Sequence, residues 1–278
     1  MESWLLIIRN VHDETILYEQ LNQALQEIRK LNASLEQKVK DRTRELEATN
    51  RELEAFAYSV SHDLRAPLRG IDGFSLALLE KYGDQLDHKG KDYLNRIRAA
   101  TRKMGSLIDD ILSLSRIATA SLQKKPVDIT VMSRDIFQSL REKEPERAAE
   151  MHISDDVKVT GDPGLLRVAM QNLIDNAWKF SSQQDVIRID IARERNGSET
   201  RIAIRDNGVG FNMKYYNKLF TMFQRLHSGR EFPGTGIGLA TVQRIVNRHS
   251  GRLWAESEVG KGSAFYMVLP DHTETSQE

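Results

Sequence analysis

The stretch Ser59-Val60-Ser61-His62-Asp63-Leu64-Arg65-Ala66-Pro67-Leu68 lies within a long helical pattern. Upstream, apolar residues recur at alternating steps of four and three from Leu17 to Leu35. The repeat then continues from Val39 to Val60, after a step of four where three was due. About six heptads of this kind predict a parallel dimeric coiled coil, and the extra step is a stutter that locally unwinds it. A solvated single helix with chance periodicity is the alternative.

Downstream of this stretch, the helical pattern continues to Leu78 and breaks at residues 82–84, Tyr-Gly-Asp. Pro67 is expected to bend or loosen the helix just after His62. A second helix is predicted over Lys89–Ile117, so the two form an αα-hairpin. Each helix has an apolar stripe too wide for one partner, which predicts that two hairpins pair as the four-helix bundle of a homodimer.

The pattern changes after residues 118–126, which are small and polar and end at Pro126. Beyond this domain boundary, strands and helices alternate, which predicts an α/β sandwich with one sheet and helices packed on a face. The expected strands are Val127–Ile129, Met151–Ile153, Val186–Arg193, Thr200–Arg205, Arg252–Ser257 and Ala264–Leu269, and the expected helices are Val131–Arg141, Pro163–Phe180 and Gly236–His249. Residues 272–278 are polar and are expected to form a flexible tail.

The composition limits the function classes. The 278 residues suffice for about two domains, and 40 basic residues balance 40 acidic ones, which argues against a broad basic face for nucleic acid. The absence of cysteine excludes disulfides and thiolate metal sites. The longest early apolar run, Trp4–Ile8, is far shorter than the ~20 residues that span a bilayer. We therefore expect a soluble, cytoplasmic chain without a membrane segment.

His62 is the first candidate for chemistry. It lies two residues past Val60 of the apolar seam, about 200° around the helix, so it should point out of the bundle into solvent. Asp63 can accept a hydrogen bond from Nδ1–H, which fixes the tautomer and raises the nucleophilicity of Nε2. Arg65 can steady a phosphate. On position alone, an ordinary surface histidine fits equally well.

Asn172, Asn176 and Lys179 form a second candidate site, because they share one face of the predicted Pro163–Phe180 helix. A Mg²⁺ ion that bridges ATP phosphates and keeps several waters needs only one or two protein oxygens. An amide oxygen and a lysine on one face would serve such an ion and its phosphates. A polar solvent face is the alternative.

Two glycine-rich segments follow. Asp206-Asn207-Gly208-Val209-Gly210 comes directly after a predicted strand, and Gly234-Thr235-Gly236-Ile237-Gly238-Leu239-Ala240 opens a predicted helix. Glycines there leave amide donors free to cradle phosphates near a helix N-terminus. The second segment has neither the Gly-Lys-Ser/Thr of a Walker A loop nor the spacing of a dinucleotide fingerprint. Taken singly, each segment could be a tight turn.

Together these segments resemble a known family. Ser61–Leu68 resembles the H-box of the sensor histidine kinases of two-component systems, in the form found in phytochrome-like and PAS-linked members. Asn172–Phe180 resembles the family's N-box, and Gly234–Ala240 resembles the G2 box of the fold shared by histidine kinases, Hsp90 and DNA gyrase. Leu219–His227, followed by Ser228–Pro233, resembles the F-box and mobile ATP lid, although ordinary core packing of Phe220 and Phe223 is an alternative. The resemblance covers roughly residues 17 to 270.

The resemblance implies a dimeric helical hairpin joined to a Bergerat-type ATP-binding domain. His62 would be autophosphorylated with Asp63 as base, the metal ligand for Mg²⁺ maps onto Asn172, and the phosphoryl group would pass to an aspartate of a response regulator receiver domain. The implied ATP-binding residues are Asn172, Asn176, Lys179, Phe180, Asp206, Gly208, Gly210, Arg225, Gly234, Thr235, Gly236, Ile237, Gly238 and Leu239; Ser263 is a weaker candidate. Where many members carry Thr or Asn four residues after the histidine, this chain has Ala66, so we expect weak phosphatase activity.

The expected domain order begins with residues 1–15 as the last strand of a PAS-type sensor, with the rest of that upstream domain missing; a frayed leader is the alternative. Residues 16–54 would be a coiled-coil signalling helix, 55–120 the dimerisation and histidine phosphotransfer domain, and 125–271 the catalytic ATP-binding domain. Three rival functions remain: an ATP-driven conformational clamp, a scaffold that no longer binds nucleotide, and a regulator phosphatase.

Overall fold

The computed structural model describes residues 2–119, 121–196, 199–227, 231–232 and 234–270. The chain divides into two compact units, Met1–Leu53 and Glu54–Glu278, which are described in turn. Among the described helices, none is both long and apolar enough to cross a membrane.

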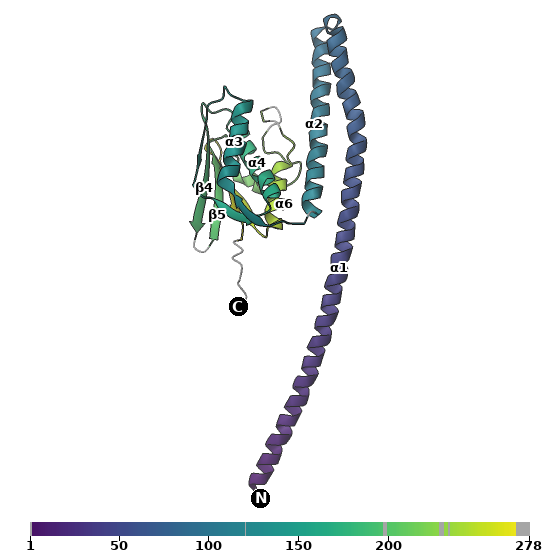
Figure 1. Ribbon diagram of the computed structural model, residues 1–278, viewed down its shortest axis with the longest axis vertical. Coiled ribbons are helices and arrows are strands. Elements are labelled where there is room, and N and C mark those ends of the chain that lie inside the picture. Colours follow the sequence, from purple (N-terminus) through teal and green to yellow (C-terminus); the bar gives the residue numbers. More distant parts are fainter. Residues whose placement is uncertain (1, 120, 197–198, 228–230, 233, 271–278) are drawn as a thin grey trace. The chain divides into compact units, whose positions relative to one another are not determined.

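The first unit is the N-terminal part of one long helix, α1, which runs from Glu2 to Tyr82 (Figure 1). The apolar residues of the predicted seam whose side chains are described are exposed on the single chain; they include Leu21, Ile28, Leu31, Leu35, Val39 and Leu46. The structure has helix from Glu2 onward, so the prediction of a strand within residues 1–15 is wrong. A lone strand has no neighbour for its backbone N–H and C=O groups, whereas a helix satisfies them within the segment. Short apolar runs do not distinguish the two.

The second unit begins with the predicted hairpin. α1 ends at Tyr82, a 3-10 turn η1 covers Gly83–Gln85, and α2 runs from His88 to Thr119 (Figure 1). The Asp87 carboxylate caps α2 by accepting from Gly90 N at 2.6 Å. Arg98 of α2 pairs with Asp72 of α1 at 3.0 Å, and both side chains are partly buried.

The rest of the second unit is a sheet with helices on one face (Figure 1). Five strands lie in the order β2-β4-β5-β7-β6, with β2 parallel to β4 and the other pairs antiparallel. They are β2 Ala149–Ile153, β4 Ile187–Asn196, β5 Glu199–Asp206, β6 Arg252–Glu258 and β7 Gly262–Val268. A separate two-stranded sheet joins β1 Lys125–Asp128 to β3 Lys158–Gly161. The helices are α3 Ile129–Lys143, α4 Pro163–Phe180, α6 Gly238–Arg248 and the short η2 Met213–Tyr215 and α5 Tyr216–Leu219.

The core lies between this sheet and its helices. Alternate residues of β4 and β5, such as Ile189, Ile191 and Ile204, are buried against apolar residues of α4, such as Leu173 and Ile174. This alternation places one face of each strand inward and the other outward. The sequence therefore predicted the sandwich correctly, apart from β3, the separate two-stranded sheet, the short η2 and α5, and shifts of one to three residues at most element ends.

A buried histidine joins α4 to α6. The Asp162 carboxylate caps α4 by accepting from Leu165 N at 3.0 Å, and the backbone N–H of Asp162 donates to His249 Nε2 at 2.9 Å. His249 Nδ1 lies 2.8 Å from Ile245 O, the carbonyl to which its N–H donates. The His249 imidazole thus fixes where α4 begins relative to the end of α6, which sets the position of the polar face of α4.

Candidate functional site

His62 lies on α1 and is open to solvent. Its side chain is 72% exposed, and its Nδ1 lies 3.2 Å from Asp63 Oδ1. A carboxylate only accepts, so Nδ1 is the donor in this contact, and the neutral form of the ring then has its lone pair on Nε2. The structure therefore presents the outward imidazole and the carboxylate partner that the sequence predicted.

Some residues next to His62 on α1 are buried in the hairpin, and others are exposed to solvent. Ser61 is buried against the hairpin, whereas Ala66 is exposed. Arg65 donates to Asp109 of α2 at 2.6 Å and is held across the hairpin. Its guanidinium thus already has a carboxylate partner, and the role of Arg65 in steadying a phosphate stays a prediction.

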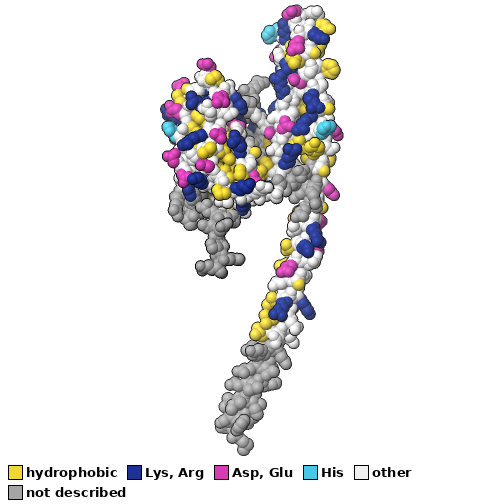
Figure 2. Space-filling view, viewed as in Figure 1, with side chains coloured by type: hydrophobic (Ala, Val, Ile, Leu, Met, Phe, Trp, Pro, Cys, Tyr) yellow, Lys and Arg dark blue, Asp and Glu magenta, His cyan; other side chains and the backbone are white. Residues whose placement is uncertain are grey.

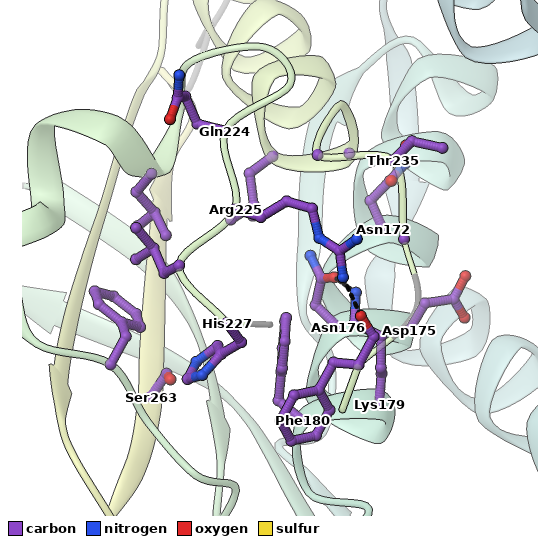
Figure 3. A pocket seen from close by; sticks show the side chains of 18 of the residues that line it. Asn172, Asp175, Asn176, Lys179, Phe180, Gln224, Arg225, His227, Thr235 and Ser263 are labelled. Carbon is purple, nitrogen blue, oxygen red and sulfur yellow. Dashed lines mark hydrogen bonds between the residues drawn. The ribbon is translucent and has the colours of Figure 1, made fainter. Parts of the chain in front are cut away.

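A cleft of about 250 Å³ opens over α4 in the α/β domain. Figure 3 shows Asn172, Asn176 and Lys179 rising from one helix toward Arg225, with His227 and Ser263 on the opposite wall. The first three come from one face of α4, as the spacing of four and three residues predicted. Residues 234–236 before α6, residues 210–211 after β5, and Ser263 and Phe265 of β7 complete the wall.

Asn172 holds a free amide oxygen next to the start of α6. Its Nδ2 donates to Val168 O at 2.8 Å, which fixes the orientation of the amide and leaves Oδ1 available as an acceptor. A Cβ added to Gly238 would lie 2.5 Å from Asn172 Oδ1, so any larger residue there would force this amide to move. An oriented amide oxygen at a helix N-terminus is a ligand type that hard cations accept.

Two cationic side chains share the cleft. Lys179 Nζ donates to Asn176 Oδ1 at 3.0 Å and lies 4.3 Å from the centre of the Phe180 ring. Burial, and then the charge of Arg225, lower the pKa of Lys179. Arg225 donates to the carbonyl of Phe232. Partly buried like charges repel each other, so an anion in the cleft would relieve an unfavourable arrangement.

An aromatic cluster forms the apolar end of the cleft. The Phe180 ring lies 5.3 Å from that of His227 and 5.2 Å from that of Phe232, and the latter two are 5.4 Å apart. Phe180 comes from the end of α4, whereas His227 and Phe232 flank the loop before Gly234. These rings offer a flat, polarisable wall to a planar base.

Asp206 is the last residue of β5, four residues before Gly210 of the cleft. Its Oδ1 accepts from Gly208 N at 2.9 Å and from Ser263 N at 3.2 Å. Burial raises the pKa of Asp206 to about 6, although the two amide donors act in the opposite direction. Gly208 and Gly210 are required for shape. A Cβ on Gly208 would lie 2.6 Å from Phe180 O, and Gly210 has φ +62° with Glu258 O only 2.1 Å from such an atom.

The structure brings most of the implied nucleotide residues together. Those that line the cleft are Asn172, Asn176, Lys179, Phe180, Gly210, Arg225, Gly234, Thr235, Gly236, Gly238 and Leu239, and the weaker candidate Ser263 also lines it. Asp206 and Gly208 do not line it; they lie four and two residues before Gly210, which does. Ile237 does not line the cleft, because its side chain is 1% exposed and packs inward where α6 begins.

Sequence reasoning missed some residues of the wall. Asp175 lies between the two predicted asparagines of α4, and burial raises the pKa of its carboxyl group. The helical spacing could have identified Asp175, because it is one turn from Gln171, which donates to it at 2.8 Å. Asp110 of α2 also lines the cleft, and no local pattern marked it.

Comparison with known proteins assigns both parts of the second unit. Residues 52–120 match the His Kinase A (phospho-acceptor) domain, and residues 161–273 match the histidine kinase-, DNA gyrase B-, and HSP90-like ATPase family. The chain is 34% identical to phytochrome-like protein Cph1 of Synechocystis sp. over 82% of its length, and 37% identical to cyanobacterial phytochrome B of Nostoc sp., also over 82%. It spans about 30% of the length of each relative.

A solved structure has the same architecture. Full-length ShkA, crystallised in complex with AMPPNP, is 25% identical and superposes with a TM-score of 0.57 over 77% of this chain and 45% of its own. The ATPase-family match and this neighbour identify the α/β domain as an ATP-binding domain. With a phosphoacceptor domain followed by this ATP-binding domain, the chain belongs to the family of two-component sensor histidine kinases.

Proposed function

We propose that the chain phosphorylates itself on His62 with ATP held in the cleft over α4. The observation that carries the proposal is the exposed imidazole whose Nδ1 faces the Asp63 carboxylate. This contact frees Nε2 for attack. The cleft supports it, because Lys179 and Arg225 offer positive charge to phosphates and the Phe180 cluster offers a wall to the base.

The proposed reaction is an in-line displacement. The Nε2 lone pair of His62 forms a bond to the γ-phosphorus, and the bond from that phosphorus to the β–γ bridging oxygen breaks, releasing ADP. The imidazole becomes cationic as the N–P bond forms. The Asp63 carboxylate, 3.2 Å from Nδ1, stabilises that charge and can accept the Nδ1 proton.

We propose that Mg²⁺ accompanies ATP and that Asn172 is its protein ligand. The fit rests on the amide, whose Nδ2 is held by Val168 O while Oδ1 lies at the start of α6. Bound Mg²⁺ would offset the negative charge of the phosphates. Asp206 would accept from the exocyclic amine of adenine through the carboxylate oxygen that does not bind the Gly208 and Ser263 amides.

The proposed acceptor of the phosphoryl group is an aspartate in the receiver domain of a response regulator. An exposed phosphohistidine on a hairpin is sterically open to such a partner. The side chain of Ala66, one helical turn beyond His62 and exposed, has no polar atom that could orient water for the reverse hydrolysis. We therefore propose kinase and phosphotransfer activity with weak phosphatase activity.

We further propose that two chains associate through their hairpins. Figure 2 shows hydrophobic side chains at the surface of the long helices, and those exposed on the hairpin include Leu64, Ile71, Phe74, Leu78, Ile97, Met104 and Ile111. Phe74 is 77% exposed, which is unusual for a phenylalanine in an isolated hairpin. Burying these faces against a second copy would complete a four-helix bundle.

Incubation with γ-labelled ATP and Mg²⁺ tests the central proposal. The wild-type chain should take up label that is lost in acid and kept in base. His62→Ala should abolish this uptake, whereas His88→Ala, an exposed histidine at the start of α2, should keep it. Acid-labile label on His62→Ala would refute the assignment of the acceptor. An unlabelled wild-type chain that nevertheless hydrolyses ATP would favour the clamp.

A further inference from the structure

A hydrogen bond joins the hairpin to the glycine-rich loop of the cleft. Thr235 Oγ1 donates to Asp110 Oδ2 at 2.6 Å, although the two residues are 125 positions apart in the chain. Thr235 stands between Gly234 and Gly236 in the loop that leads into α6. Asp110 belongs to α2, and both residues line the same cleft. A carboxylate from the hairpin therefore forms part of the candidate nucleotide site.

The position of Asp110 makes it a competitor for phosphate. The loop between Gly234 and Gly238 precedes a helix of 11 residues, where backbone amides and the helix dipole favour an anion. Asp110 supplies an anion there and occupies the Thr235 hydroxyl, a donor that a phosphate oxygen could use. Among the described residues, no cation pairs with Asp110 within 4 Å. A triphosphate entering this end of the cleft would meet a like charge at short range.

α2 also contacts α6 beyond Asp110. Arg248, at the end of α6, donates to the carbonyl of Ile117 near the end of α2. Between these points, Leu114 is 5% exposed and lines a groove with Met222 and Ala240 of the ATP-binding domain. The last three turns of α2 therefore lie along α6, with Asp110 at the end that faces the cleft.

We propose that Asp110 is an autoinhibitory latch whose bond to Thr235 must break when a triphosphate fills the cleft, so that nucleotide binding releases α2 from the ATP-binding domain. This inference rests on the proposed function, because it takes the cleft as the ATP site. Only a ligand that carries phosphates should break this bond. Adenosine, which has no phosphates, would leave the latch closed, whereas a nucleoside triphosphate would open it.

Two substitutions distinguish the effect of the negative charge of Asp110 from the effect of its hydrogen bond to Thr235. Asp110→Asn removes the charge but keeps an oxygen that can accept from Thr235, and Asp110→Ala removes both. The matched control is Asp109→Asn, which neutralises the adjacent carboxylate of α2, paired with Arg65 at 2.6 Å rather than with the loop. A lost charge-assisted hydrogen bond corresponds to at least about a tenfold change in affinity.

Affinity for Mg²⁺–AMPPNP and for adenosine should be measured on the 278-residue chain by calorimetry. Asp110→Ala should bind AMPPNP about tenfold or more tightly than the wild type, Asp110→Asn should show an intermediate gain, and adenosine affinity should stay within about twofold. Asp109→Asn should resemble the wild type. An equal gain in Asp109→Asn, or an equal gain for adenosine, would overturn the latch.

A single thiol reports the separation of the two helices. The chain has no cysteine, so Leu114→Cys introduces a unique probe in the groove between α2 and α6. Its reaction with a thiol reagent should be accelerated by AMPPNP, and by Asp110→Ala without nucleotide. Unchanged labelling in a chain that binds AMPPNP would overturn the latch alone. A wild-type chain and an Asp110→Ala chain that both fail to bind AMPPNP would overturn the nucleotide assignment itself.

Discussion

The buried carboxylate of Asp206 predicts that the chain loses stability as the pH rises. Its folded pKa is about 6, against an ordinary value of 3.8. Between these values the folded state binds more protons than the unfolded state, so the free energy of unfolding falls as pH rises. The contribution is complete below pH 3.8 and is lost as the pH passes about 6. A difference of about two pKa units corresponds to about 3 kcal/mol.

Asp206→Asn isolates this effect. The amide oxygen can accept from Gly208 N and Ser263 N as the carboxylate does, so the two hydrogen bonds stay and only the charge is removed. The variant should therefore equal the wild type at pH 4 and be more stable by up to about 3 kcal/mol at pH 8. At the same time the new amide nitrogen would replace an acceptor by a donor, so ATP affinity should fall about tenfold or more.

Urea denaturation at several pH values between 4 and 8 measures the difference in the free energy of unfolding. The control is Asp185→Asn, because Asp185 is exposed in a turn before β4 and its removal should give no such trend. A difference between Asp206→Asn and wild type that does not vary with pH would refute the argument from burial. So would a variant that is less stable than wild type at pH 8.

Three further predictions follow from single contacts. His249→Ala should lower the free energy of unfolding by about 3 kcal/mol in urea denaturation, because it leaves the N–H of Asp162 without its acceptor and opens a cavity. Gly238→Ala should weaken Mg²⁺–AMPPNP binding at least about tenfold by calorimetry, because its Cβ would displace Asn172 Oδ1; unchanged affinity would contradict the role of that oxygen. Ala66→Thr should accelerate release of phosphate from a phosphorylated regulator, and rapid release by the wild-type chain would contradict the proposal of weak phosphatase activity.

Much of the fold could be predicted where local signals were strong. The α4 helix was predicted with both ends correct, because Asp162 is a capping residue, Pro163 fits the first turn and the apolar residues recur at helical spacing. The strand β3, Lys158-Val-Thr-Gly161, was missed. It gains its conformation by pairing with β1, which no local pattern reports.

The site could also be predicted only where short stretches of sequence carried the signal. Some glycines near the cleft are required by local geometry, as at Gly208 and Gly210, so their pattern is visible in the sequence. The pairing of Arg65 with Asp109 was not predicted, because Asp109 lies 44 residues away, on the other helix of the hairpin. Asp110 was missed for the same reason, since its role depends on where α2 lies against the loop at Thr235.

The proposed latch gives the long helix a way to control nucleotide binding. If a triphosphate opens the Asp110–Thr235 contact, thermodynamic reciprocity requires that any force which separates α2 from α6 raises triphosphate affinity by the same factor. The partly buried ion pair of Arg98 and Asp72 connects α2 to α1, so we expect a displacement of α1 in the hairpin to move α2 as well. α1 also carries His62. An input that moves α1 would then change both the position of the acceptor histidine and the affinity of the cleft for a triphosphate. Arg98→Ala, which removes the ion pair with Asp72, should uncouple these two effects.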